Sequence, residues 1–552
     1  MNRRRSILLY IFIGVCVLIT KAQENVHFIP DRSSCVSGDT VWFNAILFNQ
    51  FSDNTGNVIH VQLDKLNQGH ITNVSVVCRG NRAEGYLPIP DSLSTGVYVL
   101  KAYTNFQKSE PNVILHQKYL TVYNRFETVV NLITIPKQPG RNYEAIPGMT
   151  LNAVPSGTDR INLQLDLPSG VKNNASQIIV TARLADPLAD KLGTGWTDAA
   201  IQNESTPYMA VKENKGVVVT GRVYSKETGL SKAGSTVMLS ISDTLPYFDY
   251  CISDEQGRFF FYIRGAYGTA DLVLQELTEN PDDTGIELYQ NYVSTSAVDG
   301  EEQILTNEQR SFATDVIKAS YFDKFFNRSR GLALDTFSMI KDFEYPFYGE
   351  PTKSYYPELF VDLDNFEEIS REILRGVQYR SRKGEVSIRL LDYGTQTQFK
   401  EEPFKLLDGI PILDPSYLSD MGTTRIKKVD AVFYKRYYGD LFFTGVLALY
   451  SNNPTLGWVE TMPGMRLIRY EFLQPEMKWN FASQNSRYSN IPDFNKVLLR
   501  QHIENVDEQN QFSFDLPDIE GNLIIEVTAI TKDHQILRSS KVIQPQELFT
   551  DK

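Results

Sequence analysis

Strand-length segments in which apolar and polar residues alternate recur along this chain, and they constrain its fold more than any other feature. Clear examples lie at residues 41–47, 161–167 and 512–516. In each of them every second side chain is apolar, which is the period of a β-strand that buries one face and exposes the other. The pattern predicts a mainly β, multidomain chain of tandem β-sandwiches.

The first residues have the features of a secretory signal peptide. Arginines at positions 3–5 precede an apolar-rich run of 15 residues, Ser6 to Thr20, and the small residue Ala22 follows. This order predicts a signal peptide over residues 1–22 with cleavage after Ala22. The run is shorter than the roughly 18 to 20 residues that span a bilayer, which argues against a membrane anchor. Cys16 lies inside the run rather than at its end, so we do not expect lipidation.

The mature chain is expected to be acidic and exported. Loss of residues 1–22 removes three arginines and Lys21, so the formal charge changes from −12 to −12 − 4 = −16 on about 530 residues. Such a chain is repelled by nucleic acid, so we expect no nucleic-acid partner. The longest later apolar segment, 441–450, is only strand-length, and we expect no transmembrane span after signal removal. The predicted location is the periplasm or the outer membrane of a Gram-negative envelope.

Three cysteines remain in the mature chain, and an odd number excludes a complete disulfide framework. An oxidising periplasm permits one bridge. Cys35 precedes one strand candidate and Cys78 lies in another. We predict that these two pair within the first sandwich while Cys251 stays reduced.

The N-terminal part resembles a known domain type. Ser37–Phe43, Leu93–Tyr98 and Lys101–Asn105 are similar to the macroglobulin-type domain of Bacteroidota envelope proteins, which implies a β-sandwich over residues 23–126. Residues 127–215 are predicted to form a second sandwich, of unclear family.

A different skeleton follows over residues 216–295. Val219–Val223, Thr228–Gly229, Lys232–Gly234 and Ser253–Phe259 resemble the carboxypeptidase-regulatory-like fold, a small seven-stranded sandwich. The resemblance implies a structural module without peptidase chemistry.

The next region is less regular, and the C-terminal region returns to strands. Residues 296–385 are predicted to be an irregular connector with a helix over Asn365–Arg375, and its tyrosine-rich stretch is read as packing rather than as an interaction surface. Residues 456–552 are predicted to form a C-terminal sandwich that resembles a closing macroglobulin-like domain.

Residues 386–455 contain four landmarks in a defined order. Leu407–Pro411 has a D-G turn, Ile426–Phe433 is strand-like, Tyr438–Gly439 is a second turn, and Gly445–Leu449 is a second strand. This order resembles the plug domain of TonB-dependent outer-membrane receptors and implies a small α+β plug-like domain. The alternative is an unrelated α+β domain with a D-G turn.

The resemblance implies an outer-membrane protein complex as the partner, with a β-barrel among the candidates. Only 101 residues follow Ser451, fewer than a barrel around a plug requires, so we expect no barrel of the chain's own. Four basic residues are the candidate partner contacts, namely Lys427, Lys428, Lys435 and Arg436. The first two stand where the plug family has an acidic residue, which puts its partner contacts in doubt. The alternative role of all four is to keep a strand edge soluble.

Sequence motifs for chemistry are missing. The six histidines are scattered singly, no C-x-x-C or G-x-S-x-G occurs, and no phosphate-binding or dinucleotide-binding motif is present. The C-G-E-Q segment of thioester macroglobulins is also missing. We therefore expect no catalytic residue, no cofactor and no metal, and we predict that the chain is not an enzyme.

Three functions remain open. The first is a non-enzymatic envelope scaffold that presents the plug-like domain to an outer-membrane partner complex for transport, export or assembly. The second is a glycan- or peptide-binding protein of a nutrient-uptake system. The third is a hydrolase with an unrecognised site in residues 296–385. The scaffold is preferred, because function must be argued from a site and the sequence shows modules for contact without a site for chemistry.

Overall fold

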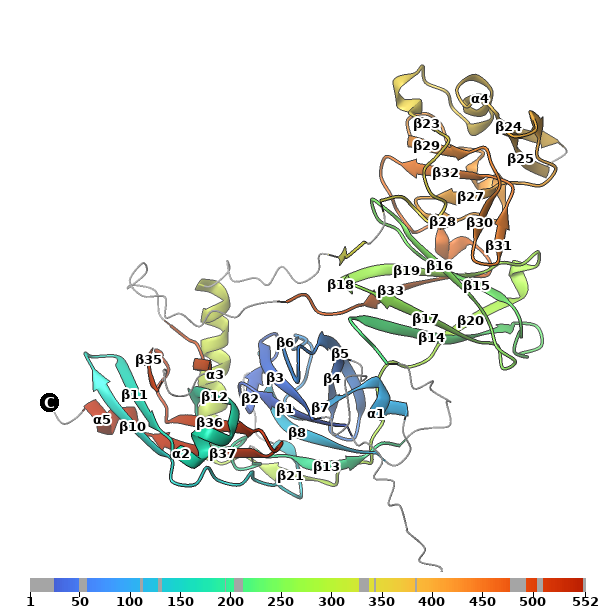
Figure 1. Ribbon diagram of the computed structural model, residues 1–552. Helices are drawn as coiled ribbons and strands as arrows, with labels where there is room; N and C mark the ends of the chain where they lie inside the picture. Colours follow the sequence, from blue (N-terminus) through green and yellow to red (C-terminus); the bar gives the residue numbers. More distant parts are fainter. Residues whose placement is uncertain are drawn as a thin grey trace, which may run out of the picture.

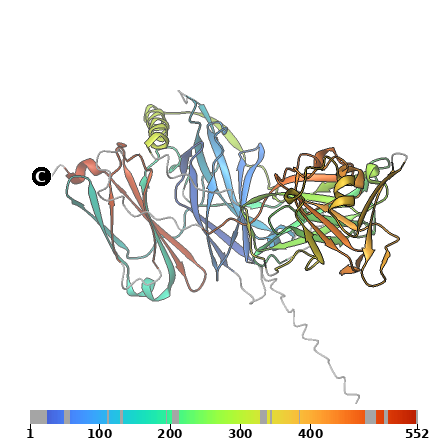
Figure 2. The same cartoon turned by 90° about the horizontal axis from the view of Figure 1, so that it is seen from above.

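The computed structural model describes residues 24–48, 57–109, 113–127, 132–193, 195–202, 212–326, 337–341, 344–382, 385–476, 493–503 and 510–549. The expected signal peptide, 1–22, lies outside the described residues. The described chain is mainly β and multidomain, as predicted. Four units follow one another in space, and the last stands at one end of the molecule (Figure 1, Figure 2). None of the described helices is both long and apolar enough to cross a membrane.

The first unit, here called the N-terminal sandwich, consists of two facing sheets. One sheet has the order β1-β3-β6 and the other β13-β8-β7-β4-β5, with β2 parallel to β8. Alternate residues such as Val41, Phe43 and Ala45 fill the core between the sheets. The strands are β1 (Asn25–Pro30), β2 (Ser34–Val36), β3 (Thr40–Phe48), β4 (Val58–Lys65), β5 (Gly69–Val77), β6 (Arg82–Pro88), β7 (Gly96–Tyr103), β8 (Ile114–Tyr123) and β13 (Thr197–Ala200), with helix α1 (Asn105–Ser109) after β7.

The second unit corrects the predicted domain organisation. The expected sandwiches over 127–215 and 456–552 are not separate domains, because most strands of both regions share the two sheets of one domain, here called the composite sandwich. One sheet has the order β10-β11-β35 and the other β34-β12-β36-β37. The elements are β10 (Thr150–Ser156), β11 (Arg160–Asp166), α2 (Ser169–Asn174), β12 (Ala175–Leu184), β34 (Val497–Ile503), β35 (Gln511–Asp515), β36 (Leu523–Thr531), β37 (Ile536–Ile543) and α5 (Pro545–Phe549).

The position of β12 explains why neither region forms a sandwich alone. This strand pairs with β34 on one side and β36 on the other, both antiparallel. Its alternate residues Ile178, Val180 and Ala182 are fully buried in the shared core. Without the C-terminal strands, β12 would lose both neighbours and one wall of its core.

The third unit, here called the middle sandwich, also takes a strand from later in the chain. Its sheets have the orders β17-β14-β20 and β16-β15-β19-β33. Six of these strands lie within the predicted range 216–295, but β33 follows the distal domain and pairs with β19. The strands are β14 (Gly216–Ser225), β15 (Thr236–Ile241), β16 (Tyr247–Ile252), β17 (Arg258–Arg264), β19 (Thr269–Glu276), β20 (Thr284–Leu288) and β33 (Met465–Glu471). Short paired strands outside the sandwiches are β9 (Leu132–Pro136) with β21 (Gly300–Ile304), and β18 (Ala266–Tyr267) with β22 (Ser338–Met339).

The predicted connector over 296–385 is not a single irregular segment. It contains a long helix, α3 (Asn307–Phe326), which the sequence did not predict. Ala313 and Val316 of α3 pack against the N-terminal sandwich, and Ala319 belongs to the composite core. The helix therefore joins two sandwiches, and residues after 344 belong to the fourth unit.

The fourth unit, residues 344–462, is here called the distal domain. Its main sheet has the order β23-β29-β32-β27-β28, and the predicted helix is α4, which covers one face together with β24 and β25. Because β23 pairs with β29, the domain begins before the predicted boundary at 386. The elements are β23 (Lys353–Tyr355), α4 (Phe366–Glu372), β24 (Val377–Arg382), β25 (Glu385–Asp392), β26 (Thr397–Gln398), β27 (Phe404–Leu407), β28 (Ile410–Pro411), β29 (Ile426–Val432), β30 (Arg436–Tyr438), β31 (Leu441–Phe443) and β32 (Val446–Ser451).

The four sequence landmarks lie at two turns and two strands of the distal domain. Asp408 and Gly409 form the two-residue turn between β27 and β28, with φ of 50° and 84°. Positive φ at both positions is what a tight hairpin of this kind requires. Gly439 lies in the turn between β30 and β31, while β29 and β32 pair antiparallel at the centre of the sheet.

Candidate functional site

One face of the distal sheet is covered by the middle sandwich. Phe404, Ala448 and Val446 of the sheet share an apolar cluster with Met238 and Phe248 of the middle sandwich. Burial of apolar surface stabilises this contact at roughly 25 cal/mol per Å². The distal domain is thus attached through a hydrophobic joint as well as by its two chain connections.

Two turns of the distal domain touch the middle sandwich at positions that require glycine. A Cβ on Gly409 would lie 2.2 Å from Cβ of Pro246, and one on Gly439 would lie 2.2 Å from the hydroxyl oxygen of Tyr250. Both glycines belong to the sequence landmarks. Their small size permits the close approach of the two domains.

The structure separates the four predicted basic contacts into two kinds. Lys428 forms an ion pair with the buried Asp430 at 2.8 Å, and Arg436 donates a hydrogen bond to the carbonyl of Tyr348 at 3.1 Å. Lys427 and Lys435 are exposed. Two of the four cations therefore hold the domain together, and two face solvent.

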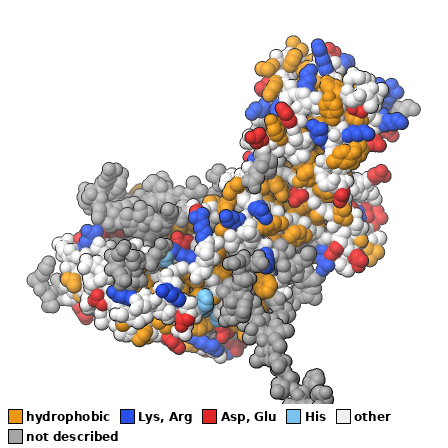
Figure 3. Space-filling model, viewed as in Figure 1, with side chains coloured by type: hydrophobic (Ala, Val, Ile, Leu, Met, Phe, Trp, Pro, Cys, Tyr) orange, Lys and Arg blue, Asp and Glu red, His pale blue; other side chains and the backbone are white. Residues whose placement is uncertain are grey.

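The hairpin of β30 and β31 exposes aromatic side chains around Lys435. Tyr434, Tyr437 and Phe442 are 42%, 70% and 42% exposed. Tyr437 packs against Phe442 with ring centroids 5.0 Å apart, and the Lys435 ammonium lies 5.7 Å from the Phe442 ring centre. On the face shown in Figure 3, apolar side chains interspersed with lysine and arginine extend over the distal domain and the middle sandwich. Sequence analysis predicted the lysine but did not consider the aromatic side chains around it, because the tyrosine-rich stretch that it read as packing lies in residues 296–385.

The predicted disulfide is wrong, because Cys35, Cys78 and Cys251 are all free. Cys35 lies in β2 and Cys78 directly follows β5, and the strands β8, β7 and β4 lie between them. At about 4.8 Å per strand, four strand steps separate the α-carbons of the two cysteines far beyond the roughly 7 Å that a bridge allows. Burial raises the pKa of the Cys78 thiol to about 12 and of the Cys251 thiol to about 11.

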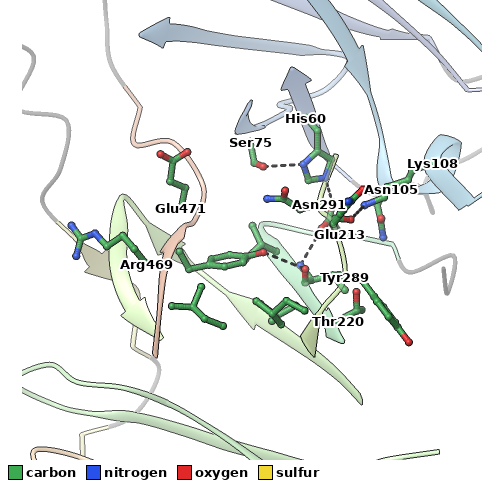
Figure 4. A pocket seen from close by; sticks show the side chains of 17 residues that line it. His60, Ser75, Asn105, Lys108, Glu213, Thr220, Tyr289, Asn291, Arg469 and Glu471 are labelled. Atoms are coloured by element: carbon green, nitrogen blue, oxygen red, sulfur yellow. Dashed lines mark hydrogen bonds and ion pairs between the residues drawn. The ribbon is translucent and has the colours of Figure 1, made fainter. Parts of the chain in front are cut away.

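A cleft of about 240 Å³ lies between the N-terminal sandwich and the middle sandwich. Its walls come from β4, β5 and α1 on one side and from β14, β33 and the segment after β20 on the other (Figure 4). A polar group of side chains faces this cleft, namely His60, Ser75, Asn105, Lys108, Glu213 and Asn291.

Three of these side chains are joined by hydrogen bonds. Nδ1 of His60 lies 2.9 Å from Oγ of Ser75, and Nε2 of His60 lies 2.6 Å from a carboxylate oxygen of Glu213. All three are buried, with exposed fractions of 8%, 7% and 4%. Figure 4 shows the His60 ring between Ser75 and Glu213, joined to each by a dashed line.

Lys108 adds a cation to the same cleft. Its ammonium donates a hydrogen bond to the carbonyl of Gln290 at 2.7 Å. Burial lowers the pKa of Lys108 to about 8, although the charge of Glu213 opposes this shift. At neutral pH the amine is therefore mainly protonated.

Sequence reasoning treated His60 as one of six isolated histidines and did not consider Ser75 or Glu213. A signal existed for the first two, because His60 and Ser75 occupy outward-facing positions of two consecutive alternating segments. The hairpin register places them directly opposite each other. Among the described residues, no group of histidine, cysteine and carboxylate side chains is arranged to hold a metal ion.

Comparisons with known proteins add little. No protein-family model matches the sequence, and no curated protein matches it. Three similar solved structures are bacterial alpha-2-macroglobulins. The trypsin-activated Escherichia coli protein has 10% identity, TM-score 0.21, and coverage of 94% of this chain and 41% of that chain. The native conformation of the Escherichia coli protein has 10% identity, TM-score 0.23, and coverage of 95% and 40%. The Salmonella protein reacted with methylamine has 10% identity, TM-score 0.22, and coverage of 94% and 39%.

The chain spans about two fifths of the length of these macroglobulins. TM-scores this low carry no argument about fold or function.

Proposed function

We propose that this chain is an exported cell-envelope scaffold that presents its distal domain to an outer-membrane partner complex. The observation that carries the proposal is the exposed aromatic hairpin of β30 and β31, on a domain held at the end of a row of sandwiches (Figure 1). The role is one of contact and needs no reacting group in the distal domain.

Three lines of reasoning support this role. The sequence resembles macroglobulin-type, carboxypeptidase-regulatory-like and plug-like domains of envelope proteins, and its first 22 residues have the pattern of a signal peptide. The middle sandwich already covers one face of the distal sheet, so no partner is needed to cover that face. The partner instead meets the aromatic hairpin.

The composition of the hairpin suits a protein contact. Tyrosine and other aromatic side chains dominate binding hot spots because they bury a large area at little entropic cost. Lys435 beside Phe442 adds a positive charge in an otherwise acidic chain. The proposed partner surface therefore offers an apolar pocket with acidic groups at its rim.

The test is photo-crosslinking from position 437 in native envelopes, followed by mass spectrometry of the crosslinked chain. The double variant Tyr437→Ala, Phe442→Ala should then weaken co-purification of that partner by roughly 30-fold for each anchor worth about 2 kcal/mol. Both side chains are exposed, so the free energy of unfolding should change by less than about 0.5 kcal/mol per site.

Phe126 supplies a matched control. It is 65% exposed and lies under the Arg125 guanidinium at 4.6 Å, an aromatic and cation pair like that of the hairpin but on the N-terminal sandwich. Phe126→Ala should leave co-purification unchanged. Equal loss in both variants, or crosslinks only to abundant proteins with no loss in the hairpin variant, would remove the hairpin from the proposal. Crosslinks to a glycan or a soluble peptide would favour the nutrient-binding alternative.

A further inference from the structure

We propose that Ser75 is an activated nucleophile that accepts a short acyl group from an ester, with His60 as its general base and Glu213 as the residue that positions His60. This site lies in the cleft between the N-terminal and middle sandwiches and is separate from the distal domain. The proposal goes beyond the scaffold role and does not rest on it. It departs from the sequence-based expectation of a chain without catalytic residues.

The hydrogen bonds define which atom carries each proton. A carboxylate only accepts hydrogen bonds, so the 2.6 Å contact of Glu213 with Nε2 requires a proton on Nε2 of His60. In the neutral tautomer that carries this proton, Nδ1 is an acceptor, and the Ser75 hydroxyl 2.9 Å away donates to it. The serine proton thus points at a base, which is the arrangement that activates serine in acyl transfer.

Neighbouring groups hold Glu213 and His60 in place. The second carboxylate oxygen of Glu213 accepts a hydrogen bond from the backbone N–H of Val218 at 3.1 Å. The His60 ring stacks on Tyr103 with centroids 5.6 Å apart. Both contacts restrict rotation, so the base and the serine are preorganised.

The proposed step transfers one acyl group. Oγ of Ser75 attacks the ester carbonyl carbon while its proton moves to Nδ1 of His60, and an oxyanion forms. The oxyanion collapses, the bond from carbon to the leaving oxygen breaks, and the leaving alkoxide takes the proton from Nδ1. The products are an acyl ester on Ser75 and a free alcohol, and no oxidant, reductant or other co-reactant is needed.

The cleft restricts the acyl donor. A volume of about 240 Å³ is below the range of about 300 to 1,000 Å³ of sites for drug-sized ligands, so a short acyl chain is favoured. The Lys108 ammonium in the same cleft favours the negative charge of the tetrahedral intermediate.

The experiment uses the full mature chain and a small alkyl fluorophosphonate, which forms a bond from phosphorus to a nucleophilic serine oxygen and releases fluoride. Peptide mass spectrometry should find the adduct at Ser75 in the native protein and not in the urea-unfolded protein. His60→Gln should slow the labelling by about 10²- to 10⁴-fold. Ser75→Ala should abolish the adduct at this peptide.

Ser354 is the matched control, because its hydroxyl donates a hydrogen bond to a carboxylate, that of Asp430 at 2.6 Å, whereas the hydroxyl of Ser75 faces a histidine. It should stay unlabelled, and Ser354→Ala should leave the Ser75 adduct unchanged. The role of Glu213 is read from ¹⁵N resonances of His60, which should show a proton on Nε2 that Glu213→Ala no longer fixes, together with slower labelling.

Native protein without an adduct at Ser75, or equal labelling rates in wild type and folded His60→Gln, would overturn the proposal. Should His60→Gln lose its native circular dichroism, the comparison of native with unfolded wild type decides instead.

Discussion

The backbone N–H of Asp440 donates a hydrogen bond to the hydroxyl oxygen of Tyr250 at 2.6 Å. This bond links the turn of the β30–β31 hairpin to β16 of the middle sandwich. The same oxygen leaves no room for a side chain at the neighbouring position, which is occupied by Gly439. The aromatic hairpin is therefore fixed at its turn by the body of the molecule, while the side chains of Tyr437 and Phe442 stay exposed.

The close approach of the distal domain can be tested at Gly409. Gly409→Ala should destabilise the protein more than Gly349→Ala does, by about 1 to 3 kcal/mol, because its Cβ would overlap Pro246 whereas nothing lies within 4 Å of a Cβ on Gly349. Both glycines have positive φ, so both variants share the cost of a left-handed alanine. Denaturant unfolding measures the difference, and equal losses would show that the two domains can separate without penalty.

The two neighbouring lysines of β29 should behave differently. Lys428→Glu should lower the free energy of unfolding by about 1 to 3 kcal/mol, because it removes the cationic partner of Asp430, which is only 3% exposed, and places a second carboxylate beside it. Lys427→Glu reverses the same charge at an exposed position and should change stability by less than about 0.5 kcal/mol. Thermal unfolding compares them. An unchanged stability of the Lys428→Glu variant would mean that the ion pair contributes nothing to the stability of the fold.

The composite sandwich predicts that the C-terminal region is needed by β12. A chain that ends at residue 476 should lose hydrogen-exchange protection at Ile178, Val180 and Ala182, because β34 and β36 are both removed. The N-terminal sandwich, whose strands all lie between residues 25 and 200, serves as the internal control and should stay protected. Unchanged protection of β12 would contradict the shared sheet.

Glu526 makes the free energy of unfolding depend on pH in the acidic range. Burial alone would raise its pKa, but Arg538 at 2.7 Å and Arg183 at 3.4 Å outweigh this and lower it to about 2. A depressed carboxyl pKa contributes stability above the unfolded value of 4.5, and that stability is lost as pH falls through about 2. This lowering of the pKa corresponds to about 3 kcal/mol of stability at neutral pH.

Urea unfolding at several pH values checks this dependence. Glu526→Gln should be less stable at pH 7 and should lose less between pH 4.5 and pH 2 than wild type. Glu255→Gln, at an exposed turn, removes the same charge and should follow the wild-type profile. Parallel profiles for wild type and Glu526→Gln would exclude Glu526 as the source.

Local sequence patterns predicted the strands well and their partners poorly. The alternation at residues 161–167 and 512–516 indicated two half-buried strands, and both are present as β11 and β35. Nothing in either segment indicates that they pair with each other across more than 300 residues, because side-chain period reports burial and not the neighbour. Most strands of the sandwiches predicted over 127–215 and 456–552 therefore belong to the one composite sandwich.

The candidate cleft shows the same limit. His60 and Ser75 lie in adjacent strands, so a correct hairpin register would have paired them from the sequence. Glu213 is 153 residues from His60, and only the packing of two domains brings its carboxylate to the ring. The basic residues were found by charge alone, and charge could not show that Lys428 and Arg436 bond within the domain.

The insertion of one unit within another sets the order in which the units can fold during synthesis. The distal domain is inserted in the middle sandwich, and both are inserted between β12 and β34, so β12 is synthesised long before its neighbours exist. Domains generally fold as they emerge, so an N-terminal sandwich that needs no later strand than β13 can close early, while β12 waits with both edges open. Such a strand is a template for unwanted pairing until the last strands arrive.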